Sequence, residues 1–558
     1  GESIGIGSYL HEPLLVDAAE LPDRAVNGMP PAEMPFPPDH FEAALTATGQ
    51  LMPSLKDVEL TRKLNGIFSF TNDGFPVLGE SPQLPGFWSA QAVWITHAGG
   101  VGKAVAEWIV EGESTTDLHE CDIRRFHPHA LSRPYVRARA AQQYREVYDI
   151  IHPRQQMTHP RNLRLTPFFA RQQELDAVFF ENAGWERPQW YDANLDLLDS
   201  RKVSGADRSG WAAQEWSPAV AAEHAATRER VALFDLTPFA VFEITGPAAL
   251  AALQRLAAND MDRPVGAITY TAMLTPRGAI KCDLTVTRLG EERFMIVTGG
   301  GMGLHDLDWM KENLPVDGSA ILTDISAGQC CIGLWGPHAR DLLSRVSEDD
   351  LSDAAFPYLT AKRITVAEVP VLALRISYVG ELGWELYAPF EQGLRLWDIL
   401  WEAGKPLGVL AAGGGAFDSL RLEKGYRLWG QDIHTEYNPY EAGIGFAVRM
   451  AKGDFIGRDA LTNIRAEGTN RRLCCMTLDD PDAVVMGKEP IMDGDRVLGY
   501  VTSANYGHTI GRGIVYGYLP LDYVNVGTTV DILYFGDRLP ATVAKEPLYD
   551  PRGTKMKA

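Results

Sequence analysis

Three glycines near residue 100 stand where an anion could bind. The stretch His97–Ala104 reads HAGGVGKA and runs into an apolar helical pattern, so glycine amides could face a phosphate at a helix N-terminus. It does not fit the nucleotide-binding P-loop, because His97 stands where that spacing needs glycine and Ala104 lacks the hydroxyl that holds magnesium. A glycine turn before a helix also serves plain backbone geometry, so both interpretations stay open.

Histidines and cysteines could bind a metal or carry redox chemistry. The run Phe126-His127-Pro128-His129 offers two ligands, but no further cluster completes a metal site, so we predict a surface turn. Six cysteines are too few for a disulfide framework. The pairs Cys330-Cys331 and Cys474-Cys475 lie in apolar runs and are predicted to be buried strand residues. This usage favours a reducing, cytoplasmic location.

The elements that position these residues differ along the chain. Residues 1–117 read as a strand at 4–9, a helix at 40–55, short strands between 65 and 91, and a helix at about 102–110. Residues 118–175 read as a connector, helical around 135–151. Residues 176–465 alternate strands with helices, and residues 466–558 carry short, regularly spaced strands typical of a small β-barrel. We predict an α+β multidomain protein.

Composition limits the function classes. A chain of 558 residues is too long for one core and predicts two to four domains. The formal net charge of −21 argues against nucleic-acid binding, which needs clustered basic residues. No run of about 18 apolar residues predicts a membrane span. The opening GESIGIGSYL has neither a signal-peptide nor a transit-peptide pattern.

A family resemblance emerges in the first part of the chain. The segments GIFSFTNDGFPVLGE and AVWITHAGGVGKAVAEWI resemble the closing element of the FAD-binding fold in amine oxidases of the D-amino-acid-oxidase type. The resemblance implies that His97, Gly99, Gly100 and Val101 lie near the flavin. The family's N-terminal G-x-G-x-x-G unit has no counterpart here. We therefore expect a fragment or subunit that does not hold FAD alone and works with a separate FAD-binding chain or domain.

The rest of the chain resembles the glycine-cleavage T-protein (aminomethyltransferase). The segments ITYTAMLTPRGAIKCDLTVTRL, RISYVGELGWELYAP, DSLRLEKGYRLWGQDI and EAGIGFAVRM carry the likeness, followed by GYVTSANYGHTIGRGI in the barrel. Together with the connector ECDIRRFHPHALSRPYV they occur in the order of the dimethylglycine oxidase and dehydrogenase family, which is similar to sarcosine dehydrogenase. The resemblance implies an FAD- and tetrahydrofolate-dependent demethylating enzyme of one-carbon metabolism.

The resemblance assigns a catalytic role to Asp283. This residue occupies the place of the acid that T-proteins set beside the reactive nitrogens of folate. A carboxylate suits that chemistry, because a nitrogen that attacks an iminium carbon must lose a proton to a general base. Without the resemblance, a strand-end aspartate bonded to backbone would be the simpler interpretation.

The resemblance also implies the folate-binding residues. Glu385 aligns with the acid that pairs with the N–H edge of the pterin, and Glu381 is a second candidate. Tyr387 shares a strand face with Glu385 and can reach the same pocket. Tyr270 could pack on the pterin ring or be a core tyrosine, and Arg427 could meet the glutamate tail or pair with Glu423.

Two departures from the T-protein pattern favour the oxidase branch. Cys282-Asp283 stands where two adjacent acids are usual, and Ala416-Phe417-Asp418 where T-proteins have A-R-D. The predicted reaction oxidises an N-methyl amino acid at FAD and passes the one-carbon unit to tetrahydrofolate, giving 5,10-methylenetetrahydrofolate. Alternatives are a flavin-free aminomethyltransferase and a non-catalytic folate-binding module.

Overall fold

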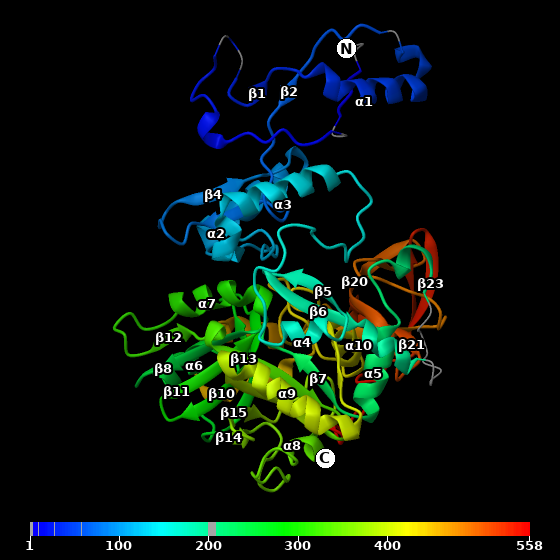
Figure 1. The fold of residues 1–558 in the computed structure, drawn as a ribbon. Coiled ribbons are helices and arrows are strands. Elements are labelled where there is room, and N and C mark those ends of the chain that lie inside the picture. Colours follow the sequence, from blue (N-terminus) through cyan, green and yellow to red (C-terminus); the bar gives the residue numbers. More distant parts are fainter. Residues whose placement is uncertain (1–3, 9–10, 27, 29, 57, 199–207) are drawn as a thin grey trace. The chain divides into compact units, whose positions relative to one another are not determined.

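The computed structural model describes residues 4–8, 11–26, 28, 30–56, 58–198 and 208–558. The chain folds into two compact units (Figure 1). The N-terminal unit contains residues 1–114 and 120–161, and the C-terminal unit contains residues 115–119 and 162–558. The predicted division into residues 1–117, 118–175, 176–465 and 466–558 remains a prediction.

The described residues of the N-terminal unit form short strands, three α-helices and several short 3-10 helices. Its elements are β1 (Glu33–Met34), α1 (Pro38–Leu51), β2 (Asn65–Gly66), β3 (Val77–Glu80), β4 (Trp88–Gln91), α2 (Ala98–Glu111) and α3 (Arg133–Glu146). The helices predicted at 40–55 and 135–151 are present, but they end earlier than predicted, at Leu51 and Glu146. The strand predicted at 4–9 is wrong for residues 4–8, which are irregular, and Tyr9 lies outside the described residues. Glycine at every second position leaves one face there without side chains to pack.

Helix α2 corrects the prediction for the glycine cluster. The helix begins at Ala98 instead of near Gly102, so Gly99 and Gly100 lie within its first turn and not in a preceding loop. Packing on its apolar face offsets the poor helix propensity of glycine. The Trp108 ring meets the Trp88 ring edge to face at 5.6 Å, which fixes the helix on β4.

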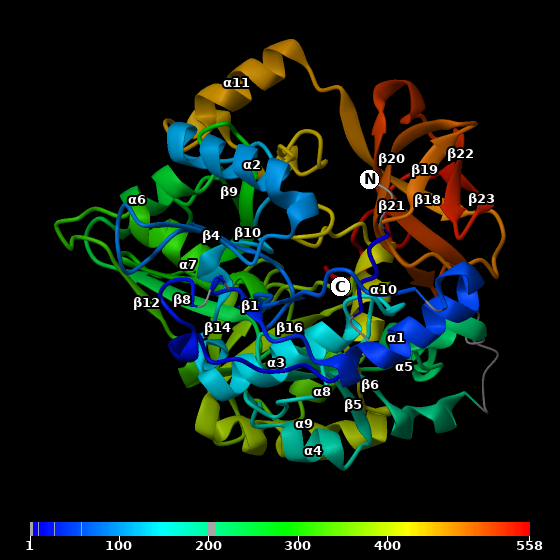
Figure 2. The same ribbon diagram turned by 90° about the horizontal axis from the view of Figure 1, so that it is seen from above.

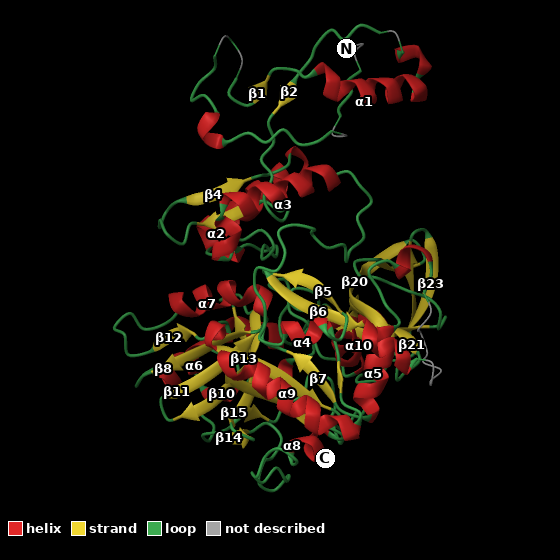
Figure 3. Ribbon diagram, in the orientation of Figure 1, coloured by secondary structure: helices red, strands yellow, loops and turns green. Residues whose placement is uncertain are grey.

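Two mainly antiparallel sheets and their helices form most of the C-terminal unit (Figure 3). The five-stranded sheet has the order β12-β8-β11-β10-β9, and the six-stranded sheet the order β14-β15-β16-β13-β7-β17. Their bounds are β7 (Ala232–Asp235), β8 (Ala240–Thr245), β9 (Ile268–Leu274), β10 (Ile280–Gly290), β11 (Arg293–Thr298), β12 (Ile321–Asp324), β13 (Gln329–Trp335), β14 (Ala361–Val366), β15 (Val369–Leu374), β16 (Gly383–Pro389) and β17 (Leu410–Ala411).

Helices and one hairpin complete this part of the C-terminal unit. The hairpin pairs β5 (Ala177–Asn182) with β6 (Trp185–Tyr191). The helices are α4 (Phe169–Gln173), α5 (Ala219–Glu229), α6 (Ala249–Leu256), α7 (Gly303–Glu312), α8 (Ala339–Leu343), α9 (Gly393–Gly404), α10 (Gly414–Glu423) and α11 (Arg458–Glu467). Strands and helices therefore mix as the α+β prediction requires.

A closed six-stranded barrel ends the unit, as predicted. Its strands are β18 (Arg471–Leu478), β19 (Pro490–Asp493), β20 (Arg496–Gly507), β21 (Arg512–Pro520), β22 (Thr529–Tyr534) and β23 (Asp537–Val543). Figure 2 shows these strands in orange and red. Closure leaves no open sheet edge.

Side-chain alternation on the strands divides the core. On β10, Cys282, Leu284 and Val286 pack in the cluster that includes residues of α6 and α7. A separate cluster brings together Ile268 of β9 and Tyr387 of β16, so it lies between the two sheets. Because successive strand residues point to opposite faces, Asp283 lies on the other face of β10, next to its partner Ala272 on β9.

Buried cysteines follow the same alternation, which confirms their prediction as strand residues. Cys330 and Cys331 on β13 lie in different core clusters, as do Cys474 and Cys475 on β18. Burial raises the pKa of Cys330, Cys331 and Cys475, so these thiols stay protonated. Their side chains pack in the core.

Residues 115–119 form a short strap on the C-terminal unit. The Asp117 N–H donates to Glu436 Oε1 at 2.9 Å, and Thr435 Oγ1 donates to Asp117 Oδ1 at 2.8 Å. His119 Nδ1 contacts Asp117 Oδ2, and the His119 ring meets the Trp429 ring at 4.9 Å. These contacts attach residues 115–119 to the region around Trp429 and Glu436, which is distant in the sequence.

Candidate functional site

Asp283 lies on β10 with a tyrosine hydroxyl on its carboxylate. Tyr270, from the neighbouring strand β9, donates to Asp283 Oδ2 at 2.9 Å. Burial raises the pKa of Asp283 to about 6, although the Tyr270 hydrogen bond acts in the opposite direction, and the charge of Asp432 adds to the rise. A carboxyl group with this pKa can accept and release protons near neutral pH.

Glu385 lies on β16 in a similar arrangement. Tyr387, two residues further along the same strand face, donates to Glu385 Oε2 at 2.8 Å. The Glu385 side chain is 8% exposed, and no lysine or arginine among the described residues forms an ion pair with it. Burial raises the pKa of Glu385 to about 7. A nearly buried carboxyl group with one hydroxyl partner can receive further N–H donors from a ligand.

The two acids lie on strands of different sheets. Glu385 shares a strand face with Tyr387, which packs in the intersheet cluster. Asp283 lies opposite Ala272 of β9, which packs in another cluster, and the joint action of the two acids on one ligand remains a prediction. Each acid is held by a tyrosine hydroxyl at one oxygen.

Tyr270 has two contacts that define its position. Its hydroxyl bonds Asp283, and its ring stacks on the Phe446 ring at 5.9 Å with 26° between the planes. Tyr270 is partly exposed, so it is not a fully buried core residue. Packing of Tyr270 on a pterin remains a prediction.

Tyr378 is an aromatic residue close to Asp283 that the sequence did not indicate. Its ring stacks on the rings of Phe417, at 5.0 Å, and Tyr426, at 5.4 Å. Its hydroxyl donates to the Arg427 carbonyl at 2.5 Å, and burial, together with the charge of Asp283, raises the pKa of Tyr378. Phe417, noted above as a departure from the T-protein pattern, therefore supports an aromatic stack near Asp283. The tyrosine two residues before Gly380, in the turn sequence SYVGELG, was the sequence feature that could have indicated this residue.

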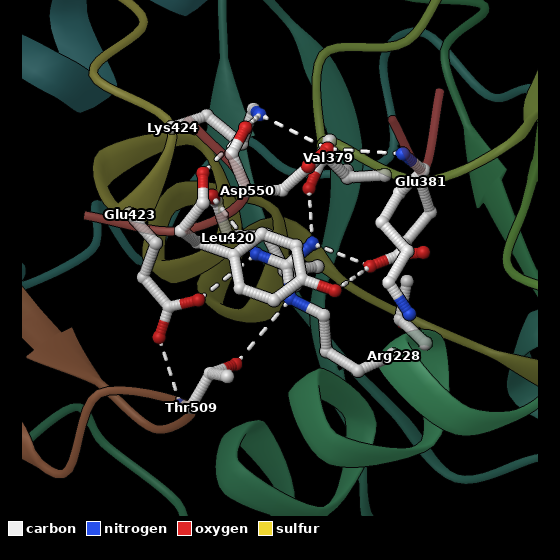
Figure 4. Close-up of polar contacts among 12 residues, drawn as sticks. Arg228, Val379, Glu381, Leu420, Glu423, Lys424, Thr509 and Asp550 are labelled. Carbon is white, nitrogen blue, oxygen red and sulfur yellow. Dashed lines mark hydrogen bonds and ion pairs between the residues drawn. The ribbon is translucent and has the colours of Figure 1, made fainter. Parts of the chain in front are cut away.

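Glu381 belongs to a buried ion network (Figure 4). Arg228 Nη1 donates to Glu381 Oε1 at 3.1 Å, and Tyr549 donates to the same oxygen at 2.6 Å. Arg228 Nη2 also donates to Glu423 Oε2 at 2.9 Å, and the guanidinium lies 3.8 Å from the centre of the Tyr549 ring. Protein donors therefore occupy Glu381 Oε1, and contact of this carboxylate with a pterin remains a prediction.

Arg427 is also engaged by protein groups. Its Nη2 donates to Glu546 Oε2 at 3.2 Å, and its Nε donates to the Ala442 carbonyl at 3.1 Å. The alternative ion pair of Arg427 with Glu423 is wrong, because Glu423 pairs with Arg228 instead. Contact of Arg427 with a glutamate tail remains a prediction, and it would require Arg427 to leave Glu546 or share its charge.

The glycine cluster presents an open helix start in the N-terminal unit. His97, the residue before α2, makes no side-chain capping bond. A Cβ atom placed on Gly99 or Gly100 would meet no atom within 4 Å, and Val101 follows in the first turn. First-turn N–H groups without a cap can bond a ligand or water.

Among the described residues, no group of three or more histidines, cysteines or acids is arranged to hold a metal ion. The rings of His127 and His129 lie 5.8 Å apart at the start of the 3-10 helix Pro128–Leu131.

The pKa of Glu385 predicts a pH-dependent stability. Its pKa is about 7 in the folded protein and 4.5 ordinarily, so the folded state holds the proton more tightly. The stabilisation is complete below pH 4.5 and is lost as pH rises through 7. Glu385→Gln should therefore stabilise the chain relative to wild type by about 1–3 kcal/mol more at pH 8 than at pH 5. Urea unfolding of both proteins at both pH values measures this effect. The same difference in unfolding free energy between variant and wild type at pH 5 and pH 8 would contradict a buried, ionisable Glu385.

Three family models match successive parts of the chain. Residues 168–452 match the GCVT N-terminal domain, residues 111–166 the FAD dependent oxidoreductase central domain, and residues 471–550 the glycine cleavage T-protein C-terminal barrel domain. The chain is 24% identical to the solved glycine cleavage system aminomethyltransferase T from Bartonella henselae, with a TM-score of 0.61 over 70% of this chain and 99% of that one. This likeness supports the fold.

Curated relatives extend the match. The chain is 36% identical to 4-methylaminobutanoate oxidase (formaldehyde-forming) from Paenarthrobacter nicotinovorans over 93% of this chain, and 34% identical to human mitochondrial dimethylglycine dehydrogenase over 94%. It spans 62% and 60% of their respective lengths. It is also 34% identical to the aminomethyltransferase of Symbiobacterium thermophilum, over 70% of this chain and 98% of that relative. No helix among the described residues is long and apolar enough to cross a membrane.

Proposed function

Because the chain belongs to the glycine cleavage T-protein (aminomethyltransferase) family, in the group that includes dimethylglycine and sarcosine dehydrogenases, we propose that its C-terminal unit binds tetrahydrofolate and accepts a one-carbon unit on it. In the complete enzyme, an N-methyl amino acid would supply that unit after oxidation at FAD. The product would be 5,10-methylenetetrahydrofolate.

The environment of Glu385 is the observation that carries this proposal. The carboxyl group is nearly buried, has no cationic partner among the described residues and receives one hydroxyl bond. Leaving a buried carboxylate so poorly paired is costly unless a ligand supplies donors. The amino and ring N–H groups of a pterin are neighbouring donors of the kind that a carboxylate accepts. Tyr387 holds one oxygen, which orients the other for the ligand.

Asp283 would act as the general base. The folate nitrogen that attacks the iminium carbon forms the new C–N bond, the iminium π electrons pass to the amine nitrogen, and Asp283 takes the proton that the folate nitrogen loses. The protonated Asp283 returns this proton to the amine nitrogen as its C–N bond breaks. The second folate nitrogen then attacks the same carbon to close 5,10-methylenetetrahydrofolate, and the proton that it loses passes to Asp283. A pKa of about 6 suits both transfers near neutral pH.

The flavin side of the proposal concerns the start of α2. FAD would supply the oxidation of the amine in the complete enzyme. His97, Gly99, Gly100 and Val101 would lie beside the flavin, where uncapped amides and the open space at the glycines allow close approach. A separate FAD-binding chain could provide the remaining contacts. Six free cysteines, five of them buried, agree with a reducing compartment, and we propose the cytoplasm.

Two other functions have specific support. A flavin-free aminomethyltransferase is favoured by the Symbiobacterium relative, which the chain covers almost completely. A non-catalytic module is favoured by a 33% identical relative described as the mitochondrial pyruvate dehydrogenase phosphatase regulatory subunit of Mus musculus. The presence of FAD in material from the native host would separate the first alternative from our proposal. Folate-dependent turnover would separate both from the second.

The proposal is tested by folate binding and product analysis. We expect calorimetry to show one tetrahydrofolate bound per chain. With the complete enzyme from the native host and an N-methyl amino acid, added tetrahydrofolate should convert free formaldehyde into 5,10-methylenetetrahydrofolate. Formaldehyde release that does not respond to tetrahydrofolate, or a wild-type chain that binds no folate, would reject the proposed function. A flavin spectrum at one FAD per isolated chain would reject the expectation that this chain does not hold FAD alone.

A further inference from the structure

Lys281 is an extra residue in strand β10. Its neighbours Ile280 and Cys282 pair with consecutive residues of β9, so Lys281 has no pairing partner on that strand. An inserted residue of this kind is a β-bulge, and bulges redirect side chains beside functional sites. Lys281 is partly exposed and lies two residues before Asp283 on the same strand. The bulge therefore places an amine close in sequence to the proposed catalytic acid.

The Lys281 side chain contacts a histidine of α7. Its Nζ lies 2.7 Å from Nε2 of His305. An ammonium group can only donate, so Nε2 accepts, and the proton of the neutral ring is on Nδ1. That nitrogen faces Asp306 Oδ1 at 3.4 Å, and burial raises the pKa of Asp306 to about 7. A nucleophile beside a base that a third group orients is the arrangement that activates an amine.

Two other enclosed lysines of the C-terminal unit have different partners. Nζ of Lys424 and Nζ of Lys452 donate to backbone carbonyl groups, which hold an ammonium in place. His305 differs because an imidazole can take up the proton and leave Lys281 as a neutral amine. A neutral amine attacks carbon electrophiles, whereas an ammonium does not.

Two tryptophans lie beside the Lys281–His305 pair. Lys281 Nζ is 5.4 Å from the centre of the Trp309 ring, and the His305 ring is 5.8 Å from the Trp429 ring. Indole rings limit the water around the pair, and water is the reagent that hydrolyses an iminium. A one-carbon adduct on Lys281 would therefore be shielded from hydrolysis on these sides.

We propose that Lys281 holds the one-carbon unit as a lysine iminium while no folate is bound. This inference rests on the proposed function, which supplies the substrate iminium, and deepens it. His305 Nε2 takes a proton from Lys281, and the lysine nitrogen bonds the iminium carbon while the C=N π electrons pass to the amine nitrogen. A proton then moves from the lysine nitrogen to the amine nitrogen. The bond from the carbon to that amine breaks, and the carbon is left doubly bonded to the Lys281 nitrogen.

The carbon keeps its oxidation level in this exchange, so no oxidant is needed. Folate can attack the lysine iminium as it attacks the substrate iminium, and Lys281 then leaves as an amine. Each chain holds one unit in this way, so continued turnover without folate still releases formaldehyde.

Reductive trapping in the isolated chain tests the amine directly. Formaldehyde is the probe: the Lys281 amine attacks its carbon, His305 returns the proton, water leaves and the same lysine iminium forms. Cyanoborohydride adds a hydride and gives stable N-methyllysine, which peptide mass spectrometry locates. We expect Lys281 to be methylated at least about tenfold faster than Lys311, an exposed lysine on α7. Methylation of Lys281 that is no faster than that of Lys311 would overturn the proposal.

His305→Gln is the matched variant. Glutamine can accept the Lys281 hydrogen bond through its amide oxygen but cannot take the proton. Methylation of Lys281 should therefore slow by about tenfold or more, and methylation of Lys311 should not change. Undiminished methylation of Lys281 in a folded variant, as judged by thermal unfolding, would overturn the role of His305. If the variant does not fold, the comparison of the two lysines in the wild-type chain still decides.

A second measurement uses the complete enzyme. With an N-methyl amino acid, cyanoborohydride and no added formaldehyde, Lys281 should be methylated in preference to Lys311, and tetrahydrofolate should suppress this preference. A preference that bound tetrahydrofolate does not suppress would overturn this inference and leave the proposed function intact. A wild-type chain that binds no folate would instead reject the proposed function, and this inference with it.

Discussion

Replacing Asp283 with asparagine is expected to slow methylene transfer by about 100- to 10,000-fold, because the change removes a general base and keeps the shape of the side chain. Asparagine can still accept the Tyr270 hydroxyl that now bonds Asp283 Oδ2 at 2.9 Å, so the pocket should keep its form. Folate affinity should therefore change less than about threefold. Single-turnover measurement in the complete enzyme separates the transfer step from amine oxidation.

The products of Asp283→Asn provide a second check. Amine oxidation should continue, and free formaldehyde should appear in place of methylenetetrahydrofolate, because an iminium that is not captured hydrolyses in water. Asp262→Asn is a suitable control, since that side chain is 66% exposed and pairs with Arg288. Wild-type methylenetetrahydrofolate formation by Asp283→Asn would identify Asp283 as a structural strand residue.

Glu385→Gln is expected to weaken tetrahydrofolate binding by about 30- to 1000-fold. The charged acceptor for the pterin edge is lost, and such buried charge-assisted bonds contribute about 2–4 kcal/mol. The loss should be largest above pH 7, where wild-type Glu385 is ionised, and should shrink as pH falls through its pKa of about 7. Calorimetry at pH 6 and pH 8 measures both the loss and its pH dependence.

Glu381→Gln is the matched control for Glu385→Gln. Both residues are nearly buried glutamates in the same sequence segment. Glu381 bonds Arg228 and Tyr549, whereas Glu385 bonds the Tyr387 hydroxyl. Its replacement should lower thermal stability and leave folate affinity within about threefold of wild type. Equal loss of folate affinity in the two variants would indicate that Glu381 also contacts folate. Unchanged affinity in Glu385→Gln would show that Glu385 does not.

Local sequence patterns predicted much of the fold. Alternating strands such as 268–274 and 280–290, and the regularly spaced barrel strands, were predicted because each buries one face. Strand β13 was harder to place as part of a sheet because QCCIGLW is apolar on both faces, although its cysteines were expected in a buried strand. The start of α2 was misplaced because glycine was interpreted as a turn signal, whereas the helix continues through Gly99 and Gly100.

In the candidate site, too, local periodicity predicted some residues, whereas contacts between distant segments place the others. The shared face of Glu385 and Tyr387 followed from strand periodicity, and their hydrogen bond confirms the proximity. Tyr378 and Phe446 were not predicted, because their positions depend on ring stacking between distant segments. The partner of Arg427 is Glu546, 119 residues away, which no local spacing indicates.

The strap at residues 115–119 has a consequence for how such proteins can be divided or recombined. Its neighbours on both sides, up to Ser114 and from Glu120, belong to the other unit, so the C-terminal unit is discontinuous in sequence. A gene fusion or excision at residue 162 would omit Asp117, leave Thr435 and Glu436 without its bonds, and uncover the Trp429 ring that His119 contacts. A transferable module therefore needs these five residues from upstream as well as the segment from 162 onward.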